Sequence, residues 1–200
     1  MQANKKPWGY EYLLYQNNDV AIWHLMLNGG QETSLHSHPN KKTGLVVLDG
    51  AAKVSFLSDS QKLFAGEKTM IRHGVFHKTK NMTRGFLSLL EIETPVNKAD
   101  IVRLKDAYGR AGQPYNDEEW FDVDGIGITG TFGSCNMKYG DNMNTLSHEY
   151  EIFMITAGKI RFEGYDVCGP GDILSIDNLN KLIVNFGSTI LEGIFIRSCI

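Results

Sequence analysis

The sequence predicts an all-β protein, a sandwich or barrel of short strands, on two observations. Short segments rich in β-branched and aromatic residues alternate with turn residues along most of the chain. Glycine is frequent, at 21 residues, and proline is rare, at 5, which is typical of many strands joined by tight turns. A chain of 200 residues can form one large domain or two small ones, and either can bury a core.

The first half of the chain holds five strand candidates. Turn sequences separate them, with glycine in Asn28–Gly30, Asp49–Gly50 and Ala65–Gly66. This regular alternation of strand and turn favours a closed or sandwiched sheet. The candidates are residues 20–27, 44–48, 52–57, 68–71 and 86–92.

The pattern changes after Pro95. Residues 99–108 carry apolar side chains at helical spacing, with Asn97 as a candidate cap and Gly109 as a candidate stop, so a short helix is expected there. Residues 110–124 are polar and read as a linker. Strand candidates then resume at 126–132, 151–156, 159–162, 172–176, 181–184 and 190–196. The expected organisation is therefore a β module over 1–95, a helical crossover and linker over 96–124, and a second β module over 125–200.

The second module repeats the turn spacing of the first. Six residues separate Thr43 from Gly50, and six separate Glu151 from Gly158. In each module a later glycine, Gly66 or Gly169, opens a further strand. Similar spacing indicates one architecture used twice.

Composition narrows the function classes. The net charge of −3 gives no general basic field for nucleic acid. No apolar run approaches the ~20 residues that span a bilayer, and the first residues contain no hydrophobic signal core. The three cysteines, Cys135, Cys168 and Cys199, form no CxxC pair and no disulfide framework, so reduced thiols in a cytoplasmic protein are expected.

Three histidines are candidate metal ligands. His36 and His38 are two residues apart, so on a strand they share one face, about 6.6 Å apart along it. A third histidine from a neighbouring strand, His77, would complete the set and leave positions open for water or substrate. The alternative is that all three are ordinary, partly buried histidines.

The residues around these histidines resemble the two motifs of the cupin family. The first motif, G-(x)5-H-x-H-(x)3-4-E-(x)6-G, is matched except at its glutamate, where this chain has Thr43. The second, G-(x)5-P-x-G-(x)2-H-(x)3-N, is matched except at its proline, where this chain has Arg72. The matching residues are Gly30, His36, His38 and Gly50 in the first motif, and Gly66, Gly74, His77 and Asn81 in the second.

Two further stretches, Lys6–Glu11 and Asp100–Arg110, resemble the ends of the sugar-phosphate cupins. That group includes cupin-type mannose-6-phosphate isomerases and the C-terminal domains of mannose-1-phosphate guanylyltransferases. The resemblance implies a cupin fold, a double-stranded β-helix or jelly-roll barrel. Residues 125–200 resemble a second, degenerate cupin more weakly, so a bicupin with a short helical crossover is expected. No nucleotidyltransferase domain is expected.

The resemblance implies one divalent metal ion, Zn, Fe, Mn or Ni, held by the three histidines. It also implies a metal-dependent reaction on a sugar phosphate or nucleotide sugar, most concretely aldose–ketose isomerisation as in mannose-6-phosphate isomerase. Among the basic residues near the motifs, Arg72 and Lys42 are the expected contacts for an anionic sugar. The general base is not identifiable from the sequence.

Thr43 keeps two other functions open. Without the motif's glutamate, three neutral imidazoles would hold the ion, as in three-histidine Fe(II) dioxygenases. A non-catalytic, sugar-binding or regulatory cupin is the third possibility. The acidic residues Glu32, Glu91 and Glu93 are expected to be solvated charges at strand ends, although one of them could replace Thr43 as a ligand.

The remaining expectations concern packing. His24 is expected to be structural, His73 to lie in a solvated turn, and His148 to lie on the surface. A homodimer paired through sheet edges is expected, with Trp8–Leu14 and Ile194–Ile200 as the edge candidates.

Overall fold

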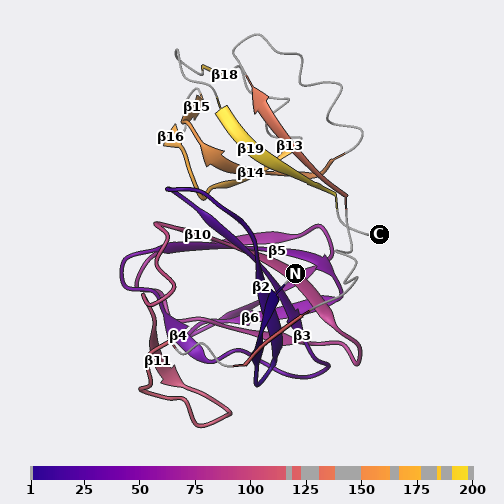
Figure 1. The fold of residues 1–200 in the computed structure, drawn as a ribbon, viewed down its shortest axis with the longest axis vertical. Coiled ribbons are helices and arrows are strands. Elements are labelled where there is room, and N and C mark those ends of the chain that lie inside the picture. Colours follow the sequence, from indigo (N-terminus) through magenta and orange to yellow (C-terminus); the bar gives the residue numbers. More distant parts are fainter. Residues whose placement is uncertain are drawn as a thin grey trace.

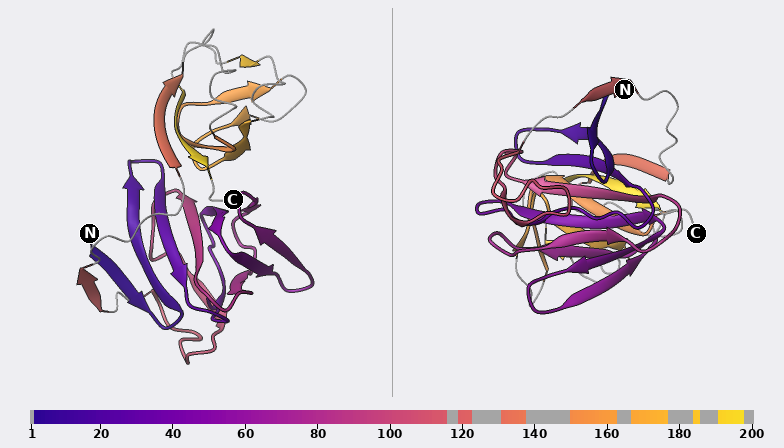
Figure 2. Two further views of the ribbon diagram at one scale, coloured as in Figure 1. Left: turned by 90° about the vertical axis from the view of Figure 1, so that its right-hand side faces the viewer. Right: turned by 90° about the horizontal axis from the view of Figure 1, so that it is seen from below.

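The computed structural model describes residues 2–115, 119–122, 131–137, 150–162, 167–176, 184–185 and 191–197. The elements that lie wholly within these ranges are β-strands, in two modules stacked on each other (Figures 1 and 2). No helix in the described part of the chain is long and apolar enough to cross a membrane.

The first module is built from two facing layers of strands. One layer is a seven-stranded sheet in the order β12-β1-β2-β3-β10-β5-β8. Its strands are β1 (Gln2–Lys6), β2 (Gly9–Gln16), β3 (Ala21–Leu27), β5 (Lys42–Asp49), β8 (Lys68–Ile71), β10 (Leu87–Thr94) and β12 (Trp120–Asp122).

The facing layer consists of two smaller sheets, β11-β4 and β7-β6-β9. An antiparallel bridge between His36 and His77 joins them. The strands are β4 (Leu35–Ser37), β6 (Ala51–Ser55), β7 (Ser60–Phe64), β9 (Lys78–Asn81) and β11 (Val102–Lys105). This is the jelly-roll arrangement that the two motifs predict.

The core of the first module lies between the layers and follows the two-residue period of its strands. On β3, Trp23, Leu25 and Leu27 belong to this inner core. They pack with side chains of the opposite layer, such as Ala52 and Val54. The alternate residues of β3 point to the other face of the large sheet.

The second module covers that other face. Its larger sheet has the order β13-β19-β14-β17, and the smaller has the order β16-β15-β18. Ile22, Val46 and Ile92 of the first module form one buried cluster with Met154 and Ile173 of the second. The strands are β13 (Thr131–Met137), β14 (Ile152–Ala157), β15 (Ile160–Phe162), β16 (Val167–Cys168), β17 (Ile173–Ser175), β18 (Val184–Asn185) and β19 (Leu191–Arg197).

The contact between the modules is close at Gly44. A Cβ atom on Gly44 would lie 2.4 Å from Cδ1 of Ile173, so only glycine fits there without movement. An ion pair between Lys42 and Asp172, 2.6 Å from Nζ to Oδ1, links the modules at the edge of the contact. The central strands β3, β10 and β5 are therefore buried on both faces of the large sheet.

The structure corrects the expected helix. Residues 102–105 form β11, and residues 120–122 of the expected linker form β12, which pairs with β1. The prediction of a helix is wrong because Arg103 is buried while its neighbours Val102 and Leu104 are about half exposed. That is the period of a strand paired on β4, not the period of a helix.

The two expected sheet edges are also wrong. Residues 9–14 belong to β2, which lies between β1 and β3. The described part of the C-terminal candidate belongs to β19, which lies between β13 and β14. The homodimer itself stays a prediction.

His24 is structural, as expected. Its side chain is fully buried beside Leu90, on the face of β3 opposite the inner core. Nδ1 lies 2.5 Å from the hydroxyl of Tyr12, and Nε2 lies 2.7 Å from the hydroxyl of Ser88. Both ring nitrogens are thus satisfied, and burial lowers the pKa of His24 to about 4.

The depressed pKa of His24 predicts an acid-sensitive fold. Between pH 6.5 and about 4 the unfolded chain takes up a proton on His24 that the folded chain does not. The free energy of unfolding should therefore fall as the pH is lowered through this range. Urea unfolding of the wild type and of His24→Asn measures it, and the variant should show the shallower pH dependence. Equal slopes would contradict the assignment.

Candidate metal centre

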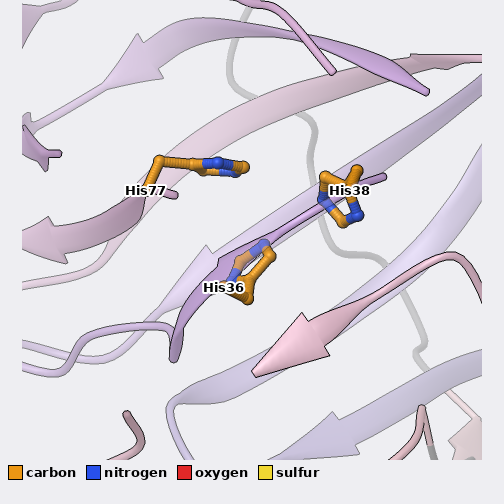
Figure 3. Close-up of side chains that lie close together, drawn as sticks. All are labelled: His36, His38 and His77. Carbon is orange, nitrogen blue, oxygen red and sulfur yellow. The ribbon is translucent and has the colours of Figure 1, made fainter. Parts of the chain in front are cut away.

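The three candidate histidines converge at one point of the first module. His36 lies on β4, His38 directly follows β4, and His77 directly precedes β9 (Figure 3). Backbone hydrogen bonds of 3.0 and 2.8 Å, one in each direction, pair His36 with His77. One ring nitrogen from each residue lies within 4.8 Å of the other two, and all three side chains are buried. The sequence prediction of this cluster is confirmed.

Backbone carbonyl groups orient all three rings. Nδ1 of His36 lies 2.8 Å from the oxygen of Ser34, and Nδ1 of His77 lies 3.0 Å from that of Val75. Nδ1 of His38 lies 2.6 Å from the oxygen of Asp100. A carbonyl oxygen can only accept, so each Nδ1 carries the proton and each Nε2 presents its lone pair.

This donor set fits a divalent metal ion. Nε2 of His38 is buried without a hydrogen-bond partner in the described part of the protein, which is costly unless a ligand completes it. Burial lowers the pKa of His38 to about 3 and that of His77 to about 4, and it places the pKa of His36 well below its usual range. Neutral imidazoles of this kind are the form that binds metal.

Within the described ranges the cluster contains histidine only. Thr43, at the position of the motif's glutamate, is buried, and its hydroxyl makes no hydrogen bond there. Glu32 is held away by an ion pair with Lys78, 2.7 Å from Oε1 to Nζ. The described residues offer no carboxylate in place of the missing one.

The Asp100–Arg110 motif holds the histidine pair in place. The carboxylate of Asp100 accepts hydrogen bonds of 2.9 and 3.1 Å from the backbone N–H groups of Asn40 and Lys41. Burial opposes ionisation, but these bonds outweigh it and lower the pKa of Asp100. Asp100 thereby fixes the turn after His38 with its side chain, and the His38 ring with its backbone oxygen. The motif was visible in the sequence, but this role was not.

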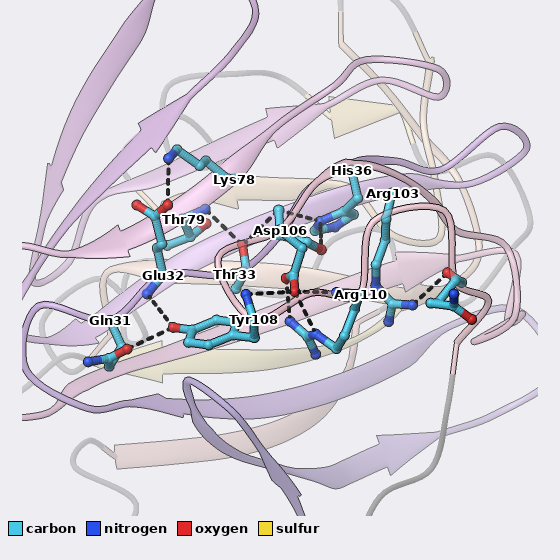
Figure 4. Close-up of polar contacts among 12 residues, drawn as sticks. Gln31, Glu32, Thr33, His36, Lys78, Thr79, Arg103, Asp106, Tyr108 and Arg110 are labelled. Carbon is cyan, nitrogen blue, oxygen red and sulfur yellow. Dashed lines mark hydrogen bonds and ion pairs between the residues drawn. The ribbon is translucent and has the colours of Figure 1, made fainter.

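Further residues of this motif make polar contacts with each other and with Gln31 (Figure 4). Arg110 donates to both carboxylate oxygens of Asp106, at 2.8 and 3.2 Å. The hydroxyl of Tyr108 donates to Oε1 of Gln31 at 2.8 Å. Arg103 lies opposite His36 in the β11–β4 register.

The triad lines a cavity that opens to solvent. Five cationic and three carboxylate side chains line it together with the histidines. The cations are Lys6, Lys41, Lys98, Arg103 and Arg110, and the carboxylates are Glu11, Glu91 and Glu93. With neutral histidines, positive charge is in excess, which favours an anionic ligand.

The expectation that Glu91 and Glu93 are solvated strand-end charges is wrong. Both lie on the central strand β10 and face the interior. The signal was present in the sequence, because both share the phase of Leu87 and Leu89, which belong to the inner core.

The substrate contacts expected at Arg72 and Lys42 stay a prediction. Arg72 is exposed and Lys42 pairs with Asp172, and neither lines the cavity. His73 is exposed, as expected of a turn. Cys168 is half-buried on β16, while His148 and Cys199 lie outside the described residues, as does the side chain of Cys135.

The chain belongs to a family with known members. The model of the family described as mannose-6-phosphate isomerase C-terminal matches residues 2–106, slightly more than half of the chain. The chain is therefore a member of this cupin family. The match ends at residue 106, and the second cupin of the expected bicupin stays a prediction.

Relatives with this region are larger proteins. The xanthan biosynthesis protein XanB of Xanthomonas campestris pv. campestris is 28% identical over 107 residues, which is 52% of this chain and 23% of that protein. The alginate biosynthesis protein AlgA of Pseudomonas aeruginosa is 25% identical over 111 residues, which is 54% of this chain and 23% of that protein. The chain thus spans about a quarter of the length of these relatives.

Solved structures with similar architecture include a protein with a double-stranded β-helix domain from Klebsiella pneumoniae. It has a TM-score of 0.44 and 21% identity, covering 48% of this chain and 84% of that chain. A sugar phosphate isomerase of the cupin superfamily from Silicibacter pomeroyi has a TM-score of 0.41 and 18% identity, and the match covers 44% of this chain and 59% of that chain.

Replacing His77 tests the metal centre. We expect His77→Ala to weaken divalent metal binding by more than about 100-fold, since loss of a mere orienting partner already costs 10–100-fold. The measurement is elemental analysis after metal loading and dialysis. His73→Ala removes an exposed histidine from the same turn and should retain the wild-type stoichiometry. Equal metal content in the two variants would contradict the site.

Proposed function

We propose that the first module is a metal-dependent isomerase that interconverts the aldose and ketose forms of a sugar phosphate. Mannose 6-phosphate is the first substrate to test. The observation that carries the proposal is the oriented histidine triad in a cavity that also holds carboxylates and an excess of cations. Membership of the mannose-6-phosphate isomerase C-terminal family supports the choice of reaction.

The ion would be held by Nε2 of His36, His38 and His77. When bound, a divalent ion such as Zn, Fe, Mn or Ni supplies Lewis acidity that polarises a carbonyl group. Isomerisation also requires a proton to move between two neighbouring carbons, and that task needs a side chain that can both accept and donate it.

The charges of the cavity suit a phosphate. Burial opposes the charge of Lys98, but Glu11, Glu93 and Glu91 outweigh it and raise the pKa of Lys98. Its ammonium group, 3.8 Å above the ring of Trp23, therefore stays charged at neutral pH. Charge-assisted hydrogen bonds from such cations are the usual way to hold a phosphate.

A coupled assay tests the proposal. The metal-loaded chain should convert mannose 6-phosphate to fructose 6-phosphate, and His77→Ala should lose this activity together with its metal. Glucose 6-phosphate, other hexose and pentose phosphates and the corresponding nucleotide sugars complete the panel. Failure of every substrate with zinc, iron, manganese, cobalt and nickel would contradict the isomerase.

A three-histidine Fe(II) dioxygenase is the second candidate. The observation in its favour is the absence of a carboxylate from the described ligand cluster. Oxygen uptake by the iron-loaded chain with small thiols, diketones and phenols distinguishes it, because an isomerase consumes no oxygen.

A further inference from the structure

Three carboxylates line the cavity, and two of them are fixed by cations. Oε1 of Glu11 lies 3.4 Å from Nζ of Lys98 and 3.8 Å from Nζ of Lys6. It also accepts a hydrogen bond of 2.8 Å from the hydroxyl of Tyr115. Burial alone would raise the pKa of Glu11, but Lys98, Lys6 and this hydrogen bond lower it, so Glu11 remains ionised.

Glu93 is fixed in the same way. One of its carboxylate oxygens accepts a hydrogen bond from the ammonium group of Lys41, and both side chains are almost completely buried. The other oxygen lies 3.9 Å from Nζ of Lys98. Glu93 is thus paired with two of the cavity's lysines.

Glu91 differs from both. It lies two residues before Glu93 on β10, opposite Trp23 on β3 and Leu45 on β5. Within the described residues it makes no hydrogen bond and no ion pair, and its side chain is only partly buried. Glu91 is therefore the carboxylate of this cavity that is available to a ligand.

The surroundings of Glu91 shift its pKa to a value that suits proton transfer. Burial raises its pKa to about 7, with Lys98 and Lys41 acting in the opposite direction and the charges of Glu93 and Glu11 adding to the rise. Glu93 lies on the same strand as Glu91, Glu11 lies on β2, Lys41 directly precedes β5, and Lys98 lies in the segment before β11. A carboxyl near half-ionisation at neutral pH can both accept and donate a proton.

We propose that Glu91 is the acid–base residue of this cavity, which takes a proton from one carbon of the bound sugar phosphate and returns it to the next. This assignment rests on the proposed isomerase function. The assignment depends on the difference in pairing among the three carboxylates. Glu11 and Glu93 form ion pairs with lysines, which prevents them from acting as the base, whereas Glu91 does not.

The proton transfer balances without a co-reactant. The Glu91 carboxylate takes the proton from C2 of the aldose, and the C2–H electron pair forms the C1=C2 double bond while the carbonyl pair moves to O1. O1 gains a proton and the O2 hydroxyl loses one by exchange with solvent. The protonated Glu91 then returns its proton to C1 as the C2=O bond forms. The product is the ketose, and Glu91 is again a carboxylate.

A direct titration tests the group itself. Carboxyl 13C NMR of protein labelled at glutamate, in the metal-free wild type and in Glu91→Gln, identifies the Glu91 resonance by its absence from the variant. We expect that resonance to titrate near pH 7. Titration near the ordinary glutamate value of ~4.3 would overturn the proposal.

A second measurement follows the substrate proton. In D2O the metal-loaded wild type should exchange the C2 proton of mannose 6-phosphate, and Glu91→Gln should slow exchange and turnover by about 10²-fold or more. The variant should keep its metal content and its thermal stabilisation by the sugar phosphate. Glu32→Gln, which removes a carboxylate outside the cavity, should exchange at the wild-type rate.

The outcomes separate the two proposals. Exchange at equal rates in the wild type and Glu91→Gln would exclude Glu91 as the base and leave the isomerase proposal standing. No exchange and no turnover by the wild type with any of the metals would remove the isomerase proposal and this assignment with it. Loss of exchange in Glu91→Gln together with loss of bound metal would also overturn the assignment, because the residue would then be structural.

Discussion

The site depends on the pair of backbone hydrogen bonds between His36 and His77. These bonds join two small sheets into one layer and bring the end of β4 beside the start of β9. Because side chains of antiparallel partners lie close together, the pairing sets the separation of the two rings before any ligand arrives. The third ring, that of His38, lies on the same side as His36 because the two residues are two apart along the chain. The carbonyl oxygen of Asp100 sets its orientation. A metal site built in this way is held by the backbone and is preorganised.

The second constraint is the charge balance inside the cavity. Lysines buried near the histidine triad would repel a cation, and Glu11 and Glu93 neutralise Lys98 and Lys41 through ion pairs. Both carboxylates are occupied by these ion pairs, so neither is available as a proton carrier. Glu91, flanked by Trp23 and Leu45 rather than by a cation at bonding distance, is left with a pKa of about 7. Strand β10 thus carries two glutamates, two residues apart, of which Glu93 forms an ion pair and Glu91 does not.

Much of the first module could be predicted from the sequence. The glycine-containing turns predicted where strands begin and end, and the spacing of the two motifs predicted that three histidines lie together. A helix was predicted over residues 99–108 because a short strand that pairs only with β4 leaves a weak period, and nothing local shows that Arg103 faces inward. Arg72 and Lys42 were chosen as substrate contacts because they are near the motifs in the sequence, and that choice stays a prediction. The inner charges come from Lys6, Lys98 and Arg103, which only tertiary pairing brings to the triad.

The central claim is that three imidazoles, oriented through Nδ1, bind one divalent ion through Nε2. X-ray absorption spectroscopy of the zinc-loaded chain tests it most directly. The account predicts one ion per chain, three imidazole ligands at ~2.0–2.1 Å with the outer-shell scattering of their rings, and no sulfur ligand. A spectrum dominated by sulfur or by oxygen without ring scattering, or a chain that retains no zinc, would contradict it.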